Sequence, residues 1–334
     1  MASSKPKKTA AKTKATQKSK ATTKAAKTEV KAEVKATEKV GKKVSKVEAE
    51  PVKAAEKPAT KKTEAKKEDA KKPGGFKLFL KDFFAKKCDS SENILTIFQN
   101  KKFYAALLAE FFGMFILSVV MLTLGIYQPL YVFFIVIAVT LAVFKTSGAN
   151  LNPLITVGMM ATRRMSAIRG VLYILVQIIG AWLGLVVVNA FRMASTGDAE
   201  LPVMAEVADG MFWTTTLLEF FGAAIIAFFF AKALHYRHSS FTFAVTAAGG
   251  VMIAFVVIYL ISYNYFGLGN NFMMNPAIAL MHQILPTSGE TFGALLGQVG
   301  LALTTYVAFP MLGGVVGFYI SDIISVLNGE DTKM

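Results

Sequence analysis

The sequence has little of what enzymes and disulfide-rich secreted proteins use. Its single cysteine, Cys88, excludes an internal disulfide framework and a cysteine-based metal site. The three histidines form no catalytic constellation with other residues, and no Walker-type glycine loop with a lysine occurs. The first 70 residues contain no apolar run of the length that a secretory signal requires. We therefore expect neither an enzyme nor a bound cofactor.

Charge is scarce over most of the chain and concentrated at its start. Residues 1–102 hold 29 of the 37 Lys and Arg residues and 12 of the 22 Asp and Glu residues, a net charge of +17. Residues 103–334 hold the remaining 8 and 10, a net charge of −2. The basic character therefore belongs to the N-terminal segment. The rest is apolar and long enough for six membrane spans of roughly 20 residues each.

The N-terminal segment itself divides into two parts. Residues 1–74 are mostly Lys, Ala, Thr, Glu and Val without an aromatic residue, a composition typical of a disordered tail. This tail is a solvated cationic segment, or it contacts anionic lipid or nucleic acid. In residues 75–102, apolar residues with helical spacing alternate with lysines: Phe76, Phe79, Leu80, Phe83 and Phe84. They predict an amphipathic juxtamembrane helix that lies in the membrane interface or docks on the cytoplasmic face of the protein.

The apolar body predicts a polytopic membrane protein. We expect six spans at about 103–124, 130–146, 168–190, 211–232, 241–262 and 292–323. Two shorter apolar pieces, about 152–160 and 275–284, are too short to cross a bilayer, which favours re-entrant half-helices. Irregular backbone at membrane depth persists only where protein or a water-filled cavity satisfies it. The two short pieces therefore predict a pore or an internal site.

Both short pieces begin with an Asn-Pro pair, Asn152-Pro153 and Asn275-Pro276. Proline suits the first helical turn, and asparagine is a strong N-cap. The start of a helix directs unpaired backbone N–H groups and a positive dipole end at whatever lies in front of it. Two such starts from opposite sides would meet at the bilayer midplane.

The body is an internal repeat. Glu110-Phe111-Phe112-Gly113 begins the first span and Glu219-Phe220-Phe221-Gly222 begins the fourth, and each is followed by a second span and then an Asn-Pro pair. Three spans per half is an odd number, so the second half enters the membrane from the opposite side. We therefore predict an all-α membrane domain over 103–323, with six transmembrane helices and two re-entrant half-helices in an inverted repeat, and a short C-terminus over 324–334.

The distribution of Lys and Arg in the loops predicts the orientation. The tail, the loop with Arg163, Arg164 and Arg169, and the loop with Lys232 and Arg237 belong on one side, whereas the opposite loops carry little positive charge. Both termini are therefore predicted to be cytoplasmic, in the plasma membrane. Lys145, at the cytoplasmic end of the second span, either lines the inner mouth or extends to the interface.

These motifs resemble the major intrinsic protein family, the aquaporins and aquaglyceroporins, over roughly residues 103–323. Ser147–Leu154 is similar to the family's first signature loop, and Met274-Asn275-Pro276-Ala277 matches the second. Gln177, Gly180, Ala181 and Gly184 match the third-span pattern. The resemblance implies an aquaporin-like fold, a homotetramer, and a passive channel for water and/or small uncharged solutes such as glycerol.

The resemblance also implies roles for individual residues. Asn152 and Asn275 would cap their own half-helices and leave amide hydrogens as donors in the pore, with Pro153, Leu154, Pro276 and Ala277 completing the two motifs. Glu110 and Glu219, which are ionisable groups within spans, would be structural carboxylates that accept hydrogen bonds from the re-entrant loops.

The sequence departs from the family at the expected filter. Leu154 stands where the first motif usually has alanine, and it either narrows the constriction or packs outward. Ile278 stands where the family usually has arginine, which removes a charge from the narrowest region. The candidate filter residues are therefore Ile278, Phe272 and Val132, and we expect an atypical, more apolar filter that passes small neutral solutes with water.

Two other classes remain open. A proton-coupled secondary transporter would use Glu110 or Glu219 as the proton carrier. Alternatively, the body is a degenerate channel that anchors a basic tail to the membrane, where the tail binds nucleic acid or lipid. Saturable, gradient-dependent uptake would favour the first, and salt-dependent binding of nucleic acid would favour the second.

Overall fold

The computed structural model describes residues 94–124, 129–197, 211–268, 272–282 and 292–329. The chain divides into two units, Met1–Ala70 and Lys71–Met334, and every described residue belongs to the second unit. The predicted tail over 1–74, the apolar-and-lysine segment up to residue 93 and the last residues of the C-terminus lie outside the described residues. The described residues contain helices and loops and no strand.

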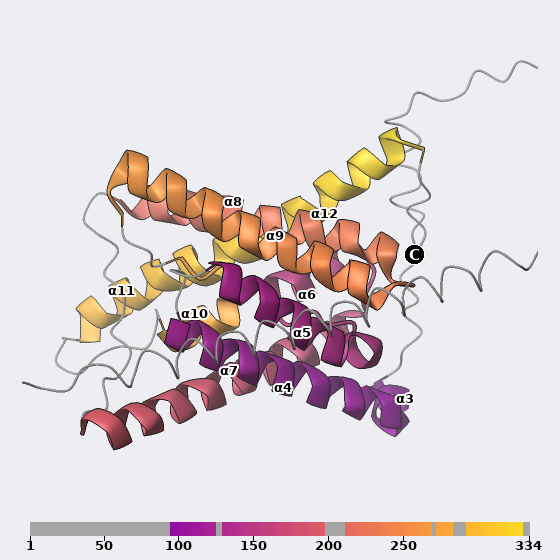
Figure 1. The fold of residues 1–334 in the computed structure, drawn as a ribbon, viewed down its shortest axis with the longest axis horizontal. Coiled ribbons are helices and arrows are strands. Elements are labelled where there is room, and N and C mark those ends of the chain that lie inside the picture. The colour runs from indigo at the N-terminus through magenta and orange to yellow at the C-terminus, as the bar shows by residue number, and fades with distance from the viewer. Residues whose placement is uncertain (1–93, 125–128, 198–210, 269–271, 283–291, 330–334) are drawn as a thin grey trace, which may run out of the picture. The chain divides into compact units, whose positions relative to one another are not determined.

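Two runs of helices correspond to the two predicted halves (Figure 1). After the short helix α3 (Ile94–Gln99), the first run comprises α4 (Lys101–Leu124), α5 (Pro129–Ser147), α6 (Pro153–Ala161) and α7 (Ala167–Thr196). The second run comprises α8 (Phe212–Ala233), η2 (Leu234–Tyr236), α9 (Ser240–Ile261), η3 (Ser262–Phe266), α10 (Pro276–His282), α11 (Phe292–Leu303), η4 (Thr304–Ala308) and α12 (Phe309–Leu327).

Six of the described helical segments are long and apolar enough to cross a membrane. They agree with the six predicted spans, and α6 and α10 agree with the two short pieces. The last span differs in detail, because it runs from Gly297 to Leu327. A π-helical turn at Thr304–Ala308 precedes Pro310, which stands in the first turn of α12 where its missing N–H is tolerated, so the span continues past the proline as predicted.

The two halves pack in corresponding ways. Helix α4 packs on α5 and α7, and its counterpart α8 packs on α9 and α12. Each half-helix packs on a span of the other half: α6 lies against α12, and α10 lies against α7. Figure 1 shows α6 and α10 between the α4, α5 and α7 group and the α8, α9 and α12 group. This arrangement confirms the predicted inverted repeat of an all-α membrane protein.

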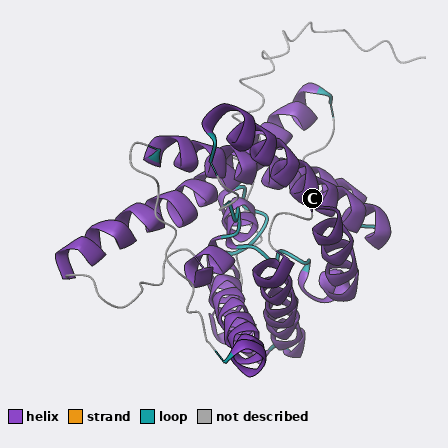
Figure 2. Ribbon diagram, turned by 60° about the vertical axis from the view of Figure 1, so that its left-hand side comes forward, coloured by secondary structure: helices purple, strands orange, loops and turns teal. Residues whose placement is uncertain are grey.

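The same close helix approach occurs in each half. A Cβ atom placed on Gly180 of α7 would lie 2.5 Å from the backbone oxygen of Phe111 on α4. A Cβ atom on Gly313 of α12 would collide with the backbone oxygen of Phe220 on α8. Only glycine lets the helix backbones come this near, as is common between membrane helices. This packing leaves the loops that precede α6 and α10 in the interior of the helices (Figure 2).

Candidate functional site

The two Asn-Pro pairs form the starts of the half-helices. The Asn152 side-chain oxygen accepts a hydrogen bond from the Leu154 backbone N–H at 3.0 Å, at the start of α6. The Asn275 side-chain oxygen accepts from the Ala277 backbone N–H at 3.2 Å, at the start of α10. Each asparagine therefore caps its own half-helix, and each proline occupies a first-turn position where no N–H is needed.

The side-chain amides of the two asparagines link the halves. Asn152 Nδ2 donates to the Met274 carbonyl at 2.9 Å, and Asn275 Nδ2 donates to the Leu151 carbonyl at 3.2 Å. Each acceptor is the residue that precedes the other asparagine, so the exchange is reciprocal. It brings the positive ends of α6 and α10 together. Because each amide has two hydrogens, Asn152 keeps one donor beyond this exchange, and Asn275 Nδ2 also lies 3.9 Å from the sulfur of Met114, which is a weak acceptor.

A buried carboxylate holds each re-entrant loop. Glu110 of α4 accepts hydrogen bonds from the backbone N–H groups of Asn150 and Leu151, at 3.0 and 2.8 Å, and from Gln177 Nε2 at 2.8 Å. Glu219 of α8 accepts from the N–H groups of Met273 and Met274. Both glutamates are fully buried. They supply acceptors to N–H groups that no regular helix satisfies at this depth.

The residue before each asparagine joins these two sets of hydrogen bonds. Leu151 and Met274 have positive φ angles of 49° and 45°, a left-handed conformation that is unfavourable for side chains of this size. In each, the N–H group bonds to the glutamate of its own half and the carbonyl bonds to the asparagine of the other half. Sequence reasoning missed these residues, because leucine and methionine give no signal for a left-handed backbone.

We expect Glu219→Gln to destabilise the protein by about 1.5–3 kcal/mol, the usual contribution of hydrogen bonds to a charged group. One of the two backbone donors, Met273 N or Met274 N, would then face an NH2 group instead of an acceptor. The measurement is unfolding in mixed micelles, with water flux in parallel. Glu206→Gln, in the predicted loop between α7 and α8, is the control for loss of one negative charge; equal effects of the two variants would contradict an anchoring role.

The three candidate filter residues are all buried in the main apolar core. Val132, Phe272 and Ile278 are 2%, 2% and 1% exposed and belong to the same cluster of contacting apolar side chains. Leu154 is also fully buried. A Cβ atom on Gly314 of α12 would lie 2.5 Å from the backbone oxygen of Leu154. The absence of a side chain at Gly314 therefore makes room for the first turn of α6.

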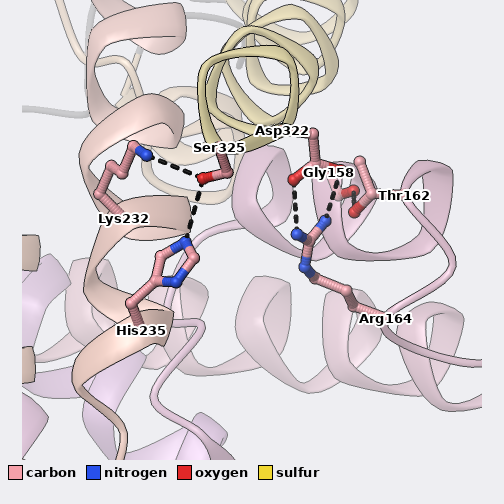
Figure 3. Close-up of polar contacts among 7 residues, drawn as sticks. All are labelled: Gly158, Thr162, Arg164, Lys232, His235, Asp322 and Ser325. Atoms are coloured by element: carbon pink, nitrogen blue, oxygen red, sulfur yellow. Dashed lines mark hydrogen bonds and ion pairs between the residues drawn. The ribbon is translucent and has the colours of Figure 1, made fainter. Parts of the chain in front are cut away.

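A buried ion pair that sequence reasoning missed connects α12 to the loop after α6. Arg164 donates two hydrogen bonds to the two carboxylate oxygens of Asp322, at 3.1 and 2.6 Å, and both side chains are less than a tenth exposed. One α-helical turn further along α12, Ser325 accepts from Lys232 at 2.9 Å (Figure 3). The end of α12 thus ties α6 and α8 together. Among the described residues, no group of His, Cys, Asp and Glu gathers as a metal site.

Six membrane-length helices, two opposed half-helices and a reciprocal asparagine pair define a polytopic membrane protein of the channel class. The model of the major intrinsic protein family matches residues 97–324. The chain therefore belongs to this family, whose members are channels for water or small solutes rather than enzymes. A similar solved structure is the aquaglyceroporin from Plasmodium falciparum, with 16% identity, 67% of this chain and 96% of that chain covered, and a TM-score of 0.45.

Proposed function

We propose that this protein is a passive channel for water and small uncharged solutes such as glycerol. The observation that carries the proposal is the reciprocal pairing of Asn152 and Asn275 in front of two opposed helix starts. The remaining amide hydrogens can donate to a water or hydroxyl oxygen that passes between them. The two positive helix ends at the same place oppose cations, protons included.

The outer constriction in this proposal is the apolar group of Val132, Phe272 and Ile278. All three side chains are apolar and almost fully buried, which supports an uncharged passage with little free space. A passage of this kind discriminates by size and by the cost of removing water from the solute. It favours molecules with an apolar carbon face over ions.

We expect Ile278→Arg to lower the ratio of glycerol to water permeability by about tenfold, which corresponds to a change of about 1.4 kcal/mol in relative barrier height. The guanidinium would narrow the passage and introduce donors that hold water. Stopped-flow light scattering on proteoliposomes measures both permeabilities. Ile278→Leu, which conserves volume, is the control and should leave the ratio unchanged; an unaltered ratio in Ile278→Arg would remove Ile278 from the filter.

The first test of the channel itself uses the wild-type protein in proteoliposomes. A sucrose step measures water efflux, and a glycerol gradient measures the re-entry of solute. Fast shrinkage followed by fast re-entry supports the proposal, and fast shrinkage without re-entry restricts the permeant to water. Rates equal to those of empty liposomes overturn it.

The hydrogen bonds of Glu110 and Glu219 weigh against a proton-coupled transporter. Both carboxylates are fully buried and face N–H donors, so each already has a structural task. Saturable uptake that depends on a proton gradient is the result that would favour transport. A role of the basic tail in binding nucleic acid or lipid concerns residues outside the described part, and salt-dependent binding is its test.

We further propose that the protein is a homotetramer in the plasma membrane and that both of its termini face the cytoplasm. Arg164 and Lys232 both contact the last turns of α12, at Asp322 and Ser325, so these cations gather at one end of the helices. Lys145 and Arg237 line one cavity with Met165, which follows Arg164 directly. A cluster of Lys and Arg at one membrane face is typical of the cytoplasmic side.

A further inference from the structure

A cavity of about 700 Å³ opens at the end of the helices where α5 ends and α9 begins. We call it the vestibule, and it is lined by Phe144, Lys145, Ser147, Gly148, Asn150, Met159, Met165, Leu234, Arg237 and His238. Asn150, which lines the vestibule, lies two residues before Asn152 in the chain. Its volume exceeds what a water or a three-carbon polyol needs and falls within the range of about 300–1,000 Å³ of small-molecule sites.

The vestibule is lined by basic side chains without acidic ones. Its lining includes Lys145, Arg237 and His238 and no carboxylate. Within the described part of the chain, none of these three side chains makes a hydrogen bond or an ion pair. The neighbouring cations differ, because Arg164 pairs with Asp322 and Lys232 donates to Ser325 (Figure 3). The positive charge of the vestibule is therefore available to a ligand.

The charge and the polar groups indicate the ligand. Lys145 and Arg237 supply two positive charges, which match the roughly −1.5 to −2 charge of a phosphate monoester at neutral pH. Arginine binds phosphate oxygens through two parallel hydrogen bonds, and lysine adds a point charge. The Ser147 hydroxyl is a polar group in the same lining, and Phe144 and Leu234 provide an apolar wall for the carbon chain of an ester.

We propose that the vestibule binds a phosphate monoester of a small polyol and that the bound ester obstructs the inner end of the conduit. The inference rests on the proposed function, because it assigns the ligand to the same path that the uncharged polyol takes. A dianion cannot enter the apolar constriction of Val132, Phe272 and Ile278 without a large desolvation cost, so it acts from the vestibule side alone.

The inference also places the channel in a reaction sequence. The class of reaction that supplies the ester is phosphoryl transfer on the same side of the membrane: the hydroxyl of the neutral polyol attacks the terminal phosphorus of a nucleoside triphosphate, loses its proton and releases the diphosphate. That product is retained by its charge. Its binding in the vestibule slows further entry of the polyol, so the flux falls as the product accumulates.

Binding is tested with the full-length protein in detergent. Isothermal titration with glycerol 3-phosphate is expected to show saturable binding that Lys145→Gln and Arg237→Gln each weaken by about tenfold or more. Arg192→Gln, in the last turns of α7 and outside the vestibule lining, is the matched control and should bind as the wild type does. Glycerol itself should not compete at equal concentration. Equal binding by wild type and both vestibule variants would overturn the site.

Obstruction is tested by glycerol flux in proteoliposomes of phosphatidylcholine, with the ester inside, outside or absent. The glycerol flux of the wild type should fall at least about threefold when the ester is on the vestibule side, and should not change when it is on the other side. In the double variant Lys145→Gln/Arg237→Gln, the ester should no longer change the flux. A second arm replaces the ester by phosphatidic acid in the bilayer. Slowing by phosphatidic acid alone would assign the site to a lipid headgroup and overturn a soluble ester.

The two proposals fail in different ways. If the wild type binds the ester in the titration but carries no water or glycerol without it, the channel proposal fails and the binding site stands. If the flux is fast and neither the ester nor phosphatidic acid binds or slows it, the vestibule proposal fails and the channel stands.

Discussion

Arg164→Leu is expected to destabilise the folded protein by about 3–5 kcal/mol, the cost of breaking a buried ion pair on one side. The substitution leaves the Asp322 carboxylate, which is 5% exposed, without the guanidinium that contacts both of its oxygens at 3.1 and 2.6 Å. Arg164 also lies 5.8 Å from the centre of the Phe318 ring, so its loss removes a cation–π contact. Unfolding in mixed micelles, followed by circular dichroism, measures the change in free energy.

The double variant Arg164→Leu/Asp322→Leu is the matched control for this pair. Because both charges are absent, no buried charge is left alone, and apolar replacements of a buried pair are often neutral. We expect the double variant to recover most of the lost stability. If it is as unstable as the single variant, the loss comes from packing or from other contacts of these residues rather than from an isolated charge.

Gly313→Val is expected to destabilise the protein by at least about 3 kcal/mol, the upper end of the usual cost of overpacking. The new Cβ would collide with the backbone oxygen of Phe220, and a helix backbone cannot move aside as a flexible side chain can. Helices α8 and α12 would have to separate, which would displace Asp322 and Ser325 as well. The measurement is the same unfolding titration, with the yield of folded protein as a second readout.

Gly249→Val provides the same chemical change without the collision. Gly249 lies in α9, and a Cβ atom there meets no atom within 4 Å. Its substitution should change the free energy of unfolding by less than about 1 kcal/mol, with a small gain expected, since only helix propensity changes and valine exceeds glycine on that scale. Similar losses at positions 249 and 313 would show that valine itself, and not the close approach of α8 and α12, causes the effect.

Much of the fold follows from the sequence because it depends on short-range signals. The apolar runs predict the six spans, and Asn152-Pro153 and Asn275-Pro276 predict the starts of the half-helices within a residue or two. The ends of spans are predicted less well, since the last span is predicted over 292–323 and runs from Gly297 to Leu327. The change of winding inside it, at the π-helical turn of Thr304–Ala308, has no local signal in the sequence. A proline such as Pro310 often breaks a helix, but here the wider π-helical turn before it lets the helix continue.

The contacts inside the site depend on three-dimensional arrangement and could not be predicted in the same way. The pairing of Arg164 with Asp322 spans 158 residues, and no local pattern marks it. The gathering of Lys145, Arg237 and His238 around one cavity requires that the end of α5 and the connection before α9 lie together. A positive φ at Leu151 and Met274 has no signature in those residue types. The filter assignments of Val132, Phe272 and Ile278 stay predictions until flux is measured.

The reciprocal bonds of the two asparagines also set an order of events during synthesis. Asn152 and its acceptor Met274 are 122 residues apart, and Asn275 and its acceptor Leu151 are 124 apart. While the first half enters the bilayer, the partners of Asn152 and Leu151 have not yet left the ribosome. The bonded asparagine pair therefore cannot form in a half-made chain, and its hydrogen bonds close only after the second re-entrant loop has been made.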